Sequence, residues 1–280
     1  MIDASAPIHP SATLTDQGYA ALPALLSPGD VAWVTEHVDR LLDGPLPDSC
    51  HRPHNTLVPL RWNDPIVTPL LADVDRRLRI AFDIGATDLR WTSGYISVKE
   101  PWSPPLWWHQ DWWYWQHPVS FAPEAAQVTV ACYLTDTTPQ TGALRLLPGS
   151  HRRSHPVHAM LPEAHSTAAT TLDQAHPAFS NQPGQMTPEV RAGDAVVMDY
   201  RLLHGTHPNA ASGRRDCILL NFSPRWSDLP AAIRGHLISH PALPGPPAEE
   251  QPGPDTNGWL PSYSGLRRDL PLSRHPPAVF

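Results

Sequence analysis

The first eighty-five residues contain two segments in which apolar residues recur every three or four positions, the spacing of one face of an α-helix. The first segment begins at Ser27, where a proline and an acid follow as they do at a helix N-cap, and it ends at Gly44. The second begins at Asp64, which precedes another proline, and stops before Gly85. We therefore expect two amphipathic helices within residues 27–85.

From residue 88 onward the pattern changes to short apolar or alternating runs separated by turn residues, which is the pattern of β-strands. The expected strands are 90–98, 127–134, 143–147, 195–199 and 217–222. Short strands preceded by helices favour a mainly β fold, a sandwich or barrel with flanking helices packed on one side.

A chain of 280 residues is compatible with a single all-β domain. We expect one domain over 1–280, with N-terminal helices at about 27–85 and a barrel core at about 88–225. Residues 226–280 are expected to form an irregular cover because prolines are dense there and disfavour long helices. Residues 152–188 have no clear period and resemble an insertion.

Charge and composition narrow the class of partner. The net charge is −7 and the longest basic runs are only two residues, so nothing resembles the clustered lysines and arginines of a nucleic-acid surface. No apolar run approaches the length of a membrane span, and no secretory signal is visible. The three cysteines are scattered and favour free thiols in a reducing compartment. We expect a cytoplasmic protein that acts on a small molecule, and we assign no oligomeric state.

A histidine followed two residues later by an aspartate occurs twice. Such pairs also arise by chance in a chain with 16 His and 27 Asp plus Glu, so the pattern alone is weak. His37 and Asp39 lie in the first expected helix, where positions i and i+2 point to nearly opposite sides. His109 and Asp111 lie in an aromatic, β-favouring run, where positions i and i+2 share one face and can bind one ion.

A second imidazole comes from His204, which follows another expected strand. Two imidazoles and one carboxylate on one side of a metal leave three positions open, the arrangement of non-haem iron(II) oxygenases. The same three ligands with an activated water would also suit a zinc hydrolase. A barrel that binds a ligand without catalysis is a further alternative.

Three motifs, in this order and at these separations, resemble the phytanoyl-CoA dioxygenase (PhyH-like) family of iron(II)/2-oxoglutarate oxygenases. They are Trp108-His109-Gln110-Asp111; Gly142-Ala143-Leu144 leading to Pro148-Gly149-Ser150-His151; and His204-Gly205-Thr206 with the later Arg215. The resemblance covers roughly residues 90–225. It implies a double-stranded β-helix (a jelly-roll, cupin-like barrel) with iron at its mouth.

The resemblance implies that His109, Asp111 and His204 are the catalytic iron ligands. It also implies that Arg215 binds the far carboxylate of 2-oxoglutarate, a task that suits the fork of an arginine. Its neighbour Arg214 is expected at the surface. Thr206 would donate to the same carboxylate, although an ordinary turn threonine remains an alternative. Lys99, the only lysine, either contacts 2-oxoglutarate or an acidic substrate, or lies solvated on an edge strand.

Six of the eleven tryptophans fall within residues 102–115, beside the first iron motif. Most are expected to pack in the core. Because the run is so dense, we expect Trp108, Trp113 and Trp115 to supply the substrate-pocket wall, which would favour a flat or bulky apolar substrate.

By this resemblance the protein is a dioxygenase that uses iron(II), 2-oxoglutarate and O2 to hydroxylate a C–H bond of a small molecule, with release of succinate and CO2. We expect the substrate to be an intermediate in the biosynthesis of a specialised metabolite. Desaturation, cyclisation and epimerisation use the same residues and stay open. Halogenation is disfavoured because the carboxylate of Asp111 is present.

Overall fold

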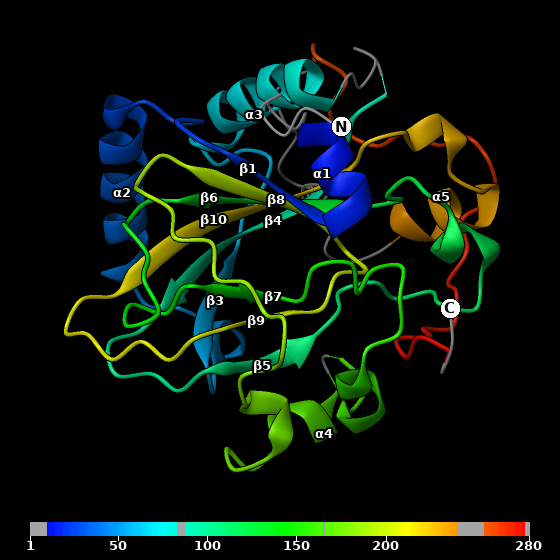
Figure 1. The fold of residues 1–280 in the computed structure, drawn as a ribbon. Coiled ribbons are helices and arrows are strands. Elements are labelled where there is room, and N and C mark those ends of the chain that lie inside the picture. The colour runs from blue at the N-terminus through cyan, green and yellow to red at the C-terminus, as the bar shows by residue number, and fades with distance from the viewer. Residues whose placement is uncertain (1–9, 83–87, 165, 240–254, 278–280) are drawn as a thin grey trace, which may run out of the picture.

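Two antiparallel sheets and their flanking helices form the structure, a computed structural model that describes residues 10–82, 88–164, 166–239 and 255–277 (Figure 1). The larger sheet has the strand order β1-β8-β6-β10-β4-β3-β2, and the smaller has the order β5-β9-β7. The larger sheet comprises β1 (Tyr19–Leu22), β2 (His51–Arg52), β3 (Asn55–Pro59), β4 (Arg90–Lys99), β6 (Val128–Tyr133), β8 (Ala195–Asp199) and β10 (Arg215–Ser223). The smaller comprises β5 (Leu106–His109), β7 (Leu144–Leu146) and β9 (His204–Thr206).

Five α-helices flank these sheets in the described part of the chain: α1 (Pro10–Gln17), α2 (Pro28–Leu42), α3 (Val67–Phe82), α4 (Thr167–Thr170) and α5 (Ala231–Leu237). Short 3-10 helices lie at Asp48–Cys50, Pro118–Phe121, Pro156–Met160, Pro177–Phe179 and Trp226–Asp228. Helices α2 and α3 lie on the outer side of the larger sheet, whereas α4 lies beyond the smaller one (Figure 1). The two facing antiparallel sheets confirm the expected jelly-roll architecture.

The central strands of the larger sheet bury both of their faces. One set of alternate residues, such as Ile96, Val130 and Leu220, packs in the main hydrophobic cluster together with the apolar faces of α2 and α3. The other set, such as Ser97, Thr129 and Cys217, points to the opposite face and lines a cavity between the two sheets. The alternation of side chains therefore gives one sheet both a structural face and a functional face.

Both expected helices are present, but only the first begins at the predicted residue. Helix α2 begins as predicted, because the Ser27 hydroxyl accepts from Asp30 N while the Asp30 carboxylate accepts from Ser27 N, a complete capping box. Helix α3 begins at Val67, later than predicted. The Asp64 carboxylate accepts from Arg61 N instead, so it closes the preceding turn and does not cap the helix. The predicted end of this helix before Gly85 lies outside the described residues.

All five expected strands are present, as β4, β6, β7, β8 and β10. The pattern missed β1, β2 and β3, which have at most five residues each, and it missed α1, α4 and α5 as well. None of the helices described is long and apolar enough to cross a membrane.

Candidate metal centre and its cavity

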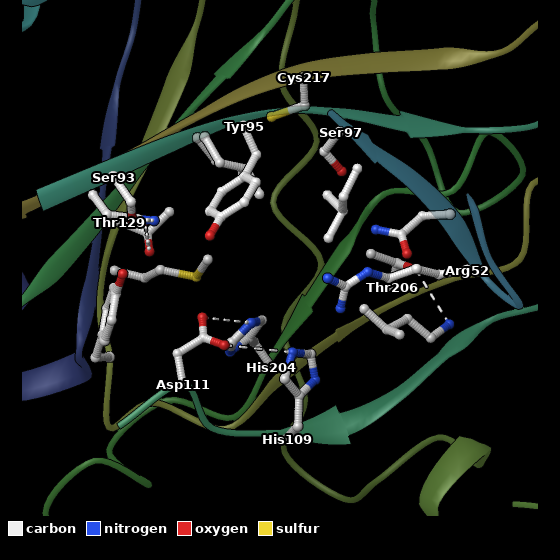
Figure 2. A pocket seen from close by; sticks show the side chains of 18 of the residues that line it. Arg52, Ser93, Tyr95, Ser97, His109, Asp111, Thr129, His204, Thr206 and Cys217 are labelled. Atoms are coloured by element: carbon white, nitrogen blue, oxygen red, sulfur yellow. Dashed lines mark hydrogen bonds and ion pairs between the residues drawn. The ribbon is translucent and has the colours of Figure 1, made fainter. Parts of the chain in front are cut away.

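His109, Asp111 and His204 meet at one end of the smaller sheet. His109 ends β5 and is the direct cross-strand partner of His204 at the start of β9, which brings the two ring centroids to 4.2 Å. The Nε2 atoms of His109 and His204 lie 3.9 Å and 3.6 Å from the two carboxylate oxygens of Asp111. One potential ligand atom from each residue lies within 4.8 Å of the other two (Figure 2).

Both imidazoles are held in the orientation that a metal requires. The Nδ1 atoms of His109 and His204 each lie 3.0 Å from a backbone carbonyl two residues earlier, Trp107 O and Leu202 O. A carbonyl oxygen only accepts, so each Nδ1 donates its proton there and each Nε2 presents a lone pair towards the centre. Metal–ligand distances of about 2.1 Å allow one ion to touch atoms up to about 4.2 Å apart, so both measured Nε2–carboxylate distances fit. The donor set therefore fits a divalent metal.

Asp111 reaches the centre differently from the sequence prediction. Strand β5 ends at His109, so Asp111 does not share a strand face with it. The backbone N–H groups of Asp111 and Trp112 both donate to Tyr200 O at 2.9 Å, and this carbonyl fixes the turn that aims the carboxylate. The second His-x-Asp pair is separated as predicted, because His37 pairs with Asp64 and Asp39 pairs with Arg214.

A cavity of about 470 Å³ lies above the metal centre, between the two sheets. This volume is within the ordinary range of small-molecule sites, roughly 300–1,000 Å³. Arg215, Cys217, Leu219 and Asn221 of β10 all line the cavity. Asp216 faces the other way, where it accepts from Arg214 Nε at 2.8 Å. The register is therefore the one that places Arg215 inside and Arg214 outside.

Two basic side chains lie next to each other at one end of this cavity. Arg215 is 5% exposed and is the cross-strand partner of Lys99, which is 1% exposed. The Lys99 ammonium donates to His54 O at 3.1 Å and to Pro104 O at 2.5 Å. Burial, with the nearby charges of Arg215 and Arg145, lowers the pKa of Lys99 to about 7. The alternative of a solvated edge-strand lysine is therefore wrong.

Thr206 also lines this end of the cavity, and its hydroxyl accepts from Leu106 N at 3.3 Å. The Nε atom of Arg215 is buried without a hydrogen-bond partner among the described residues. Because buried polar atoms are normally paired, this atom indicates that the end of the cavity is built to receive an acceptor. A dicarboxylate co-substrate supplies such acceptors.

The tryptophans that line the cavity are not the ones that the sequence predicted. Trp113 lines the cavity, and so does Trp107, which was not predicted. Trp108 is fully buried, donates its indole N–H to Ser180 O and packs with Leu147 in a separate cluster. Trp115 is buried in a cluster with Trp226 and α5. The assignments of Trp108 and Trp115 to the pocket are therefore wrong, because both side chains point into the protein core.

Exchange of Trp113 for phenylalanine should reduce substrate-stimulated turnover, whereas the same exchange at Trp115 should reduce only stability. Trp113 contacts the cavity and donates to Gln127 Oε1 at 2.7 Å, a bond that phenylalanine cannot form. We expect the ratio of substrate-stimulated to substrate-free succinate formation to fall about tenfold or more in Trp113→Phe. Equal ratios in the two variants would show that Trp113 is only a packing residue.

Sequence reasoning missed several side chains that line the cavity. Tyr95 and Tyr200 lie close enough to Asp111 for its charge to raise the pKa of each phenol, in addition to the larger effect of burial. Arg52 comes from β2 and Arg274 from the C-terminal cover. For Tyr95 the alternation along β4 was a usable signal, since it shares the face of Lys99. For Arg52 and Arg274 the sequence contains no such signal, because only tertiary contacts bring their segments to the cavity.

Comparison with known proteins agrees with this geometry. The family model of phytanoyl-CoA dioxygenase (PhyH) matches residues 14–217. A probable alpha-ketoglutarate-dependent hypophosphite dioxygenase from Stutzerimonas stutzeri is 26% identical over 136 residues, which are 49% of this chain and 46% of that protein. The chain thus spans less than half the length of this relative. An ectoine dioxygenase from Streptomyces avermitilis is 24% identical over 221 residues, 74% of this chain and 75% of that protein.

Solved structures show the same fold. HygX from Streptomyces hygroscopicus, with nickel and 2-oxoglutarate bound, superposes with a TM-score of 0.61 at 20% identity, over 79% of this chain and 88% of that one. The non-heme alpha ketoglutarate dependent epimerase SnoN from nogalamycin biosynthesis gives 0.57 at 18% identity, over 94% and 96%. The family model covers well over half of the sequence, including the metal centre and Arg215, and the chain therefore belongs to the phytanoyl-CoA dioxygenase family.

Proposed function

We propose that this protein is a non-haem iron(II)/2-oxoglutarate-dependent dioxygenase that hydroxylates a C–H bond of a small organic molecule. The observation that carries the proposal is that one cavity contains both a metal centre and a buried pair of basic side chains. A two-histidine, one-carboxylate centre lies at its base, and the buried pair of Arg215 and Lys99 lies at one end. A zinc hydrolase would need the centre but would leave this buried basic pair without a role.

His109, Asp111 and His204 would hold the iron, and Arg215, Lys99 and Thr206 would hold the far carboxylate of 2-oxoglutarate. When bound, iron(II) with 2-oxoglutarate and O2 supplies an oxidant that hydroxylates a C–H bond while the co-substrate leaves as succinate and CO2. The protein's own part is to orient both ligands and to exclude water. The low exposure of His109 and His204, 7% and 6%, is suited to this task.

Several solved neighbours are associated with natural products. One HygX structure holds hygromycin B, and SnoN belongs to nogalamycin biosynthesis. These neighbours support our proposal that the substrate here is an intermediate of specialised metabolism. SnoK is a carbocyclase and SnoN is an epimerase. Cyclisation and epimerisation therefore stay as alternatives to hydroxylation at this site. A cytoplasmic location stays a prediction.

The test is succinate formation from 2-oxoglutarate by purified protein under air with iron(II) and ascorbate. We expect slow succinate formation without substrate and none without iron. Zinc in place of iron should give no succinate, although it would support a hydrolase. A protein that binds iron and 2-oxoglutarate but never forms succinate would be a ligand-binding barrel and would contradict the proposal.

The affinity for 2-oxoglutarate should weaken as the pH rises above 7. Lys99, with its pKa lowered to about 7, is cationic below that pH and loses its proton above it. The dicarboxylate interacts best with the charged form, so its binding would take up a proton at higher pH. We expect the apparent Kd to rise by up to about tenfold per pH unit above 7. Lys99→Met should bind more weakly at pH 6.5 and should flatten this dependence; an unchanged slope in the variant would refute the role of Lys99.

A further inference from the structure

The turn between β8 and β9 determines where Asp111 lies. Strand β5 and its pairing end before this residue, at His109. The backbone N–H groups of Asp111 and Trp112 instead donate to Tyr200 O, at the beginning of the turn. The next carbonyl of the turn, Arg201 O, accepts from the side-chain amide of residue 110, which lies between two of the ligands. The position of the Asp111 carboxylate therefore depends on residues 200 and 201.

The same turn leads into His204 and orients its ring. The Nδ1 atom of His204 lies 3.0 Å from Leu202 O, which is also part of the turn. The backbone there is held in turn by Leu203 N, which donates to Ser150 Oγ at 2.9 Å. Two of the three metal ligands therefore take their orientation from carbonyl groups of this one short segment, residues 199–204.

The side chain of Arg201 fixes this segment from the side that faces away from the cavity. Arg201 and Asp199 are each 2% exposed, and neither lines the cavity. The Nε and Nη2 atoms of Arg201 donate to the Asp199 carboxylate at 3.0 Å and 2.6 Å. The same carboxylate accepts from Arg201 N at 2.8 Å. One carboxylate thus holds both the side chain and the backbone of the residue that follows Tyr200.

The guanidinium also connects the turn to the 3-10 helix that contains Ser120. Arg201 Nη1 donates to Ser120 O at 2.9 Å, and the Ser120 hydroxyl accepts from Trp112 Nε1 at 2.9 Å. Trp112 N donates back to Tyr200 O. These bonds close a loop from Arg201 through Ser120 and Trp112 to the turn. The metal ligand that precedes Trp112 is therefore held by the same closed loop.

The guanidinium uses all five of its N–H donors. Two donate to the Asp199 carboxylate and three to the backbone carbonyls of Ser120, Ala122 and Glu124. A buried ion pair contributes little net stability, because the cost of removing two charges from water offsets their attraction, and apolar residues often serve as well. So complete a set of bonds, at the turn that orients two ligands, indicates a role in geometry beyond stability.

We propose that Arg201 is a positioning residue of the metal centre. With Asp199 as its fixed partner, it holds the turn whose carbonyl groups aim Asp111 and His204. Its own side chain contacts neither the cavity nor a metal ligand. The inference rests on the proposed function, since it presumes that a metal occupies the centre.

The test is calorimetric titration of the metal-free full chain with nickel(II), for the native protein and for Arg201→Lys. Lysine keeps the charge, but it has three donors and no planar fork, so it cannot reach all the acceptors of Arg201. Loss of an outer partner of a metal ligand costs roughly 10–100-fold in affinity, so we expect the nickel(II) Kd to rise at least about tenfold. The absorption spectrum of the protein saturated with cobalt(II), which depends on ligand geometry, should change as well.

Arg214→Lys is the matched control. Arg214 also pairs with an aspartate two residues away, and this residue, Asp216, is 2% exposed like Asp199. Neither Arg214 nor Asp216 lines the cavity. The control should lower the melting temperature of the metal-free protein but leave the nickel(II) Kd and the cobalt(II) spectrum unchanged. All titrations are made below the melting temperature of each metal-free variant, so a lost affinity does not report unfolding.

The inference is overturned if folded Arg201→Lys binds nickel(II) as tightly as the native protein, or if both variants lose the same affinity. If Arg201→Lys does not fold, Asp199→Asn decides, because asparagine keeps one acceptor oxygen for the guanidinium. A rise in Kd of at least about threefold, equivalent to one modest hydrogen bond, supports the inference, and an unchanged Kd overturns it. Native protein that binds no nickel(II) would contradict the proposed function itself, and this inference with it.

Discussion

Replacement of His204 by alanine should remove bound iron and reduce succinate formation by more than about 100-fold. Loss of even an outer partner of a metal ligand costs roughly 10–100-fold in affinity, so loss of a direct ligand should cost more. The effect should be specific, because the His204 ring contributes its Nε2 to the centre and, among the residues that the structure describes, a single hydrogen bond, to Leu202 O, to the fold. Iron content measured after gel filtration, together with succinate formation, checks the expectation.

His207→Ala is the matched control for this prediction. His207 lies three residues further along the chain, outside the cavity, where its Nε2 is hydrogen-bonded to the Thr187 hydroxyl at 2.8 Å. The control should keep iron and turnover. The thermal midpoint of metal-free His204→Ala should stay close to that of the metal-free native protein, which separates metal loss from unfolding. Normal iron content and turnover in His204→Ala would refute the ligand assignment.

The sequence was informative wherever local chemistry determines structure. The capping box at Ser27 and Asp30 fixes the start of α2, and the alternation of side chains along β10 distinguishes Arg215 from Arg214. The pairing of His109 with His204 could be inferred only as a shared site, because strand register depends on partners that lie far apart in the chain.

The errors have a common physical origin in tertiary contacts. Asp64 resembles a helix cap, but its carboxylate is engaged by Arg61 N and by His37, so α3 begins later. Trp108 and Trp113 belong to the same aromatic run, yet Trp108 lies within β5 and faces away from the cavity, whereas Trp113 lies beyond the end of this strand and lines the cavity. The cover that contains Arg274 is held by two backbone hydrogen bonds to the tryptophan run, which no periodicity could reveal.

Arg215→Gln should raise the 2-oxoglutarate concentration needed for half-maximal succinate formation by at least about thirtyfold. Removal of one partner of a buried arginine–carboxylate pair costs roughly 2–5 kcal/mol, much of it from the carboxylate left unpaired. The lower limit corresponds to about thirtyfold at 1.4 kcal/mol per tenfold change. Because Arg215 is buried and its Nε has no partner among the described residues, water cannot readily replace the lost guanidinium as a partner of the carboxylate.

Arg214→Gln should give the opposite combination, with an unchanged 2-oxoglutarate requirement and reduced stability. Arg214 pairs with Asp216, which is 2% exposed, and with Asp39. Burial already raises the pKa of Asp216, and the nearby Arg214 opposes that rise. Loss of Arg214 should therefore cost about 1–3 kcal/mol of unfolding free energy at neutral pH.

The pH dependence of this loss follows from the direction of the Asp216 pKa. A carboxyl group with a raised folded-state pKa binds more protons when folded than when unfolded, so its contribution to stability falls as the pH rises from the unfolded value through the folded one. Without Arg214 the folded pKa should rise further. The melting difference between Arg214→Gln and the native protein should thus be larger at pH 8 than at pH 4. The assigned register would be contradicted by the opposite result. In that case Arg214→Gln would weaken 2-oxoglutarate binding, and Arg215→Gln would only lower the melting temperature.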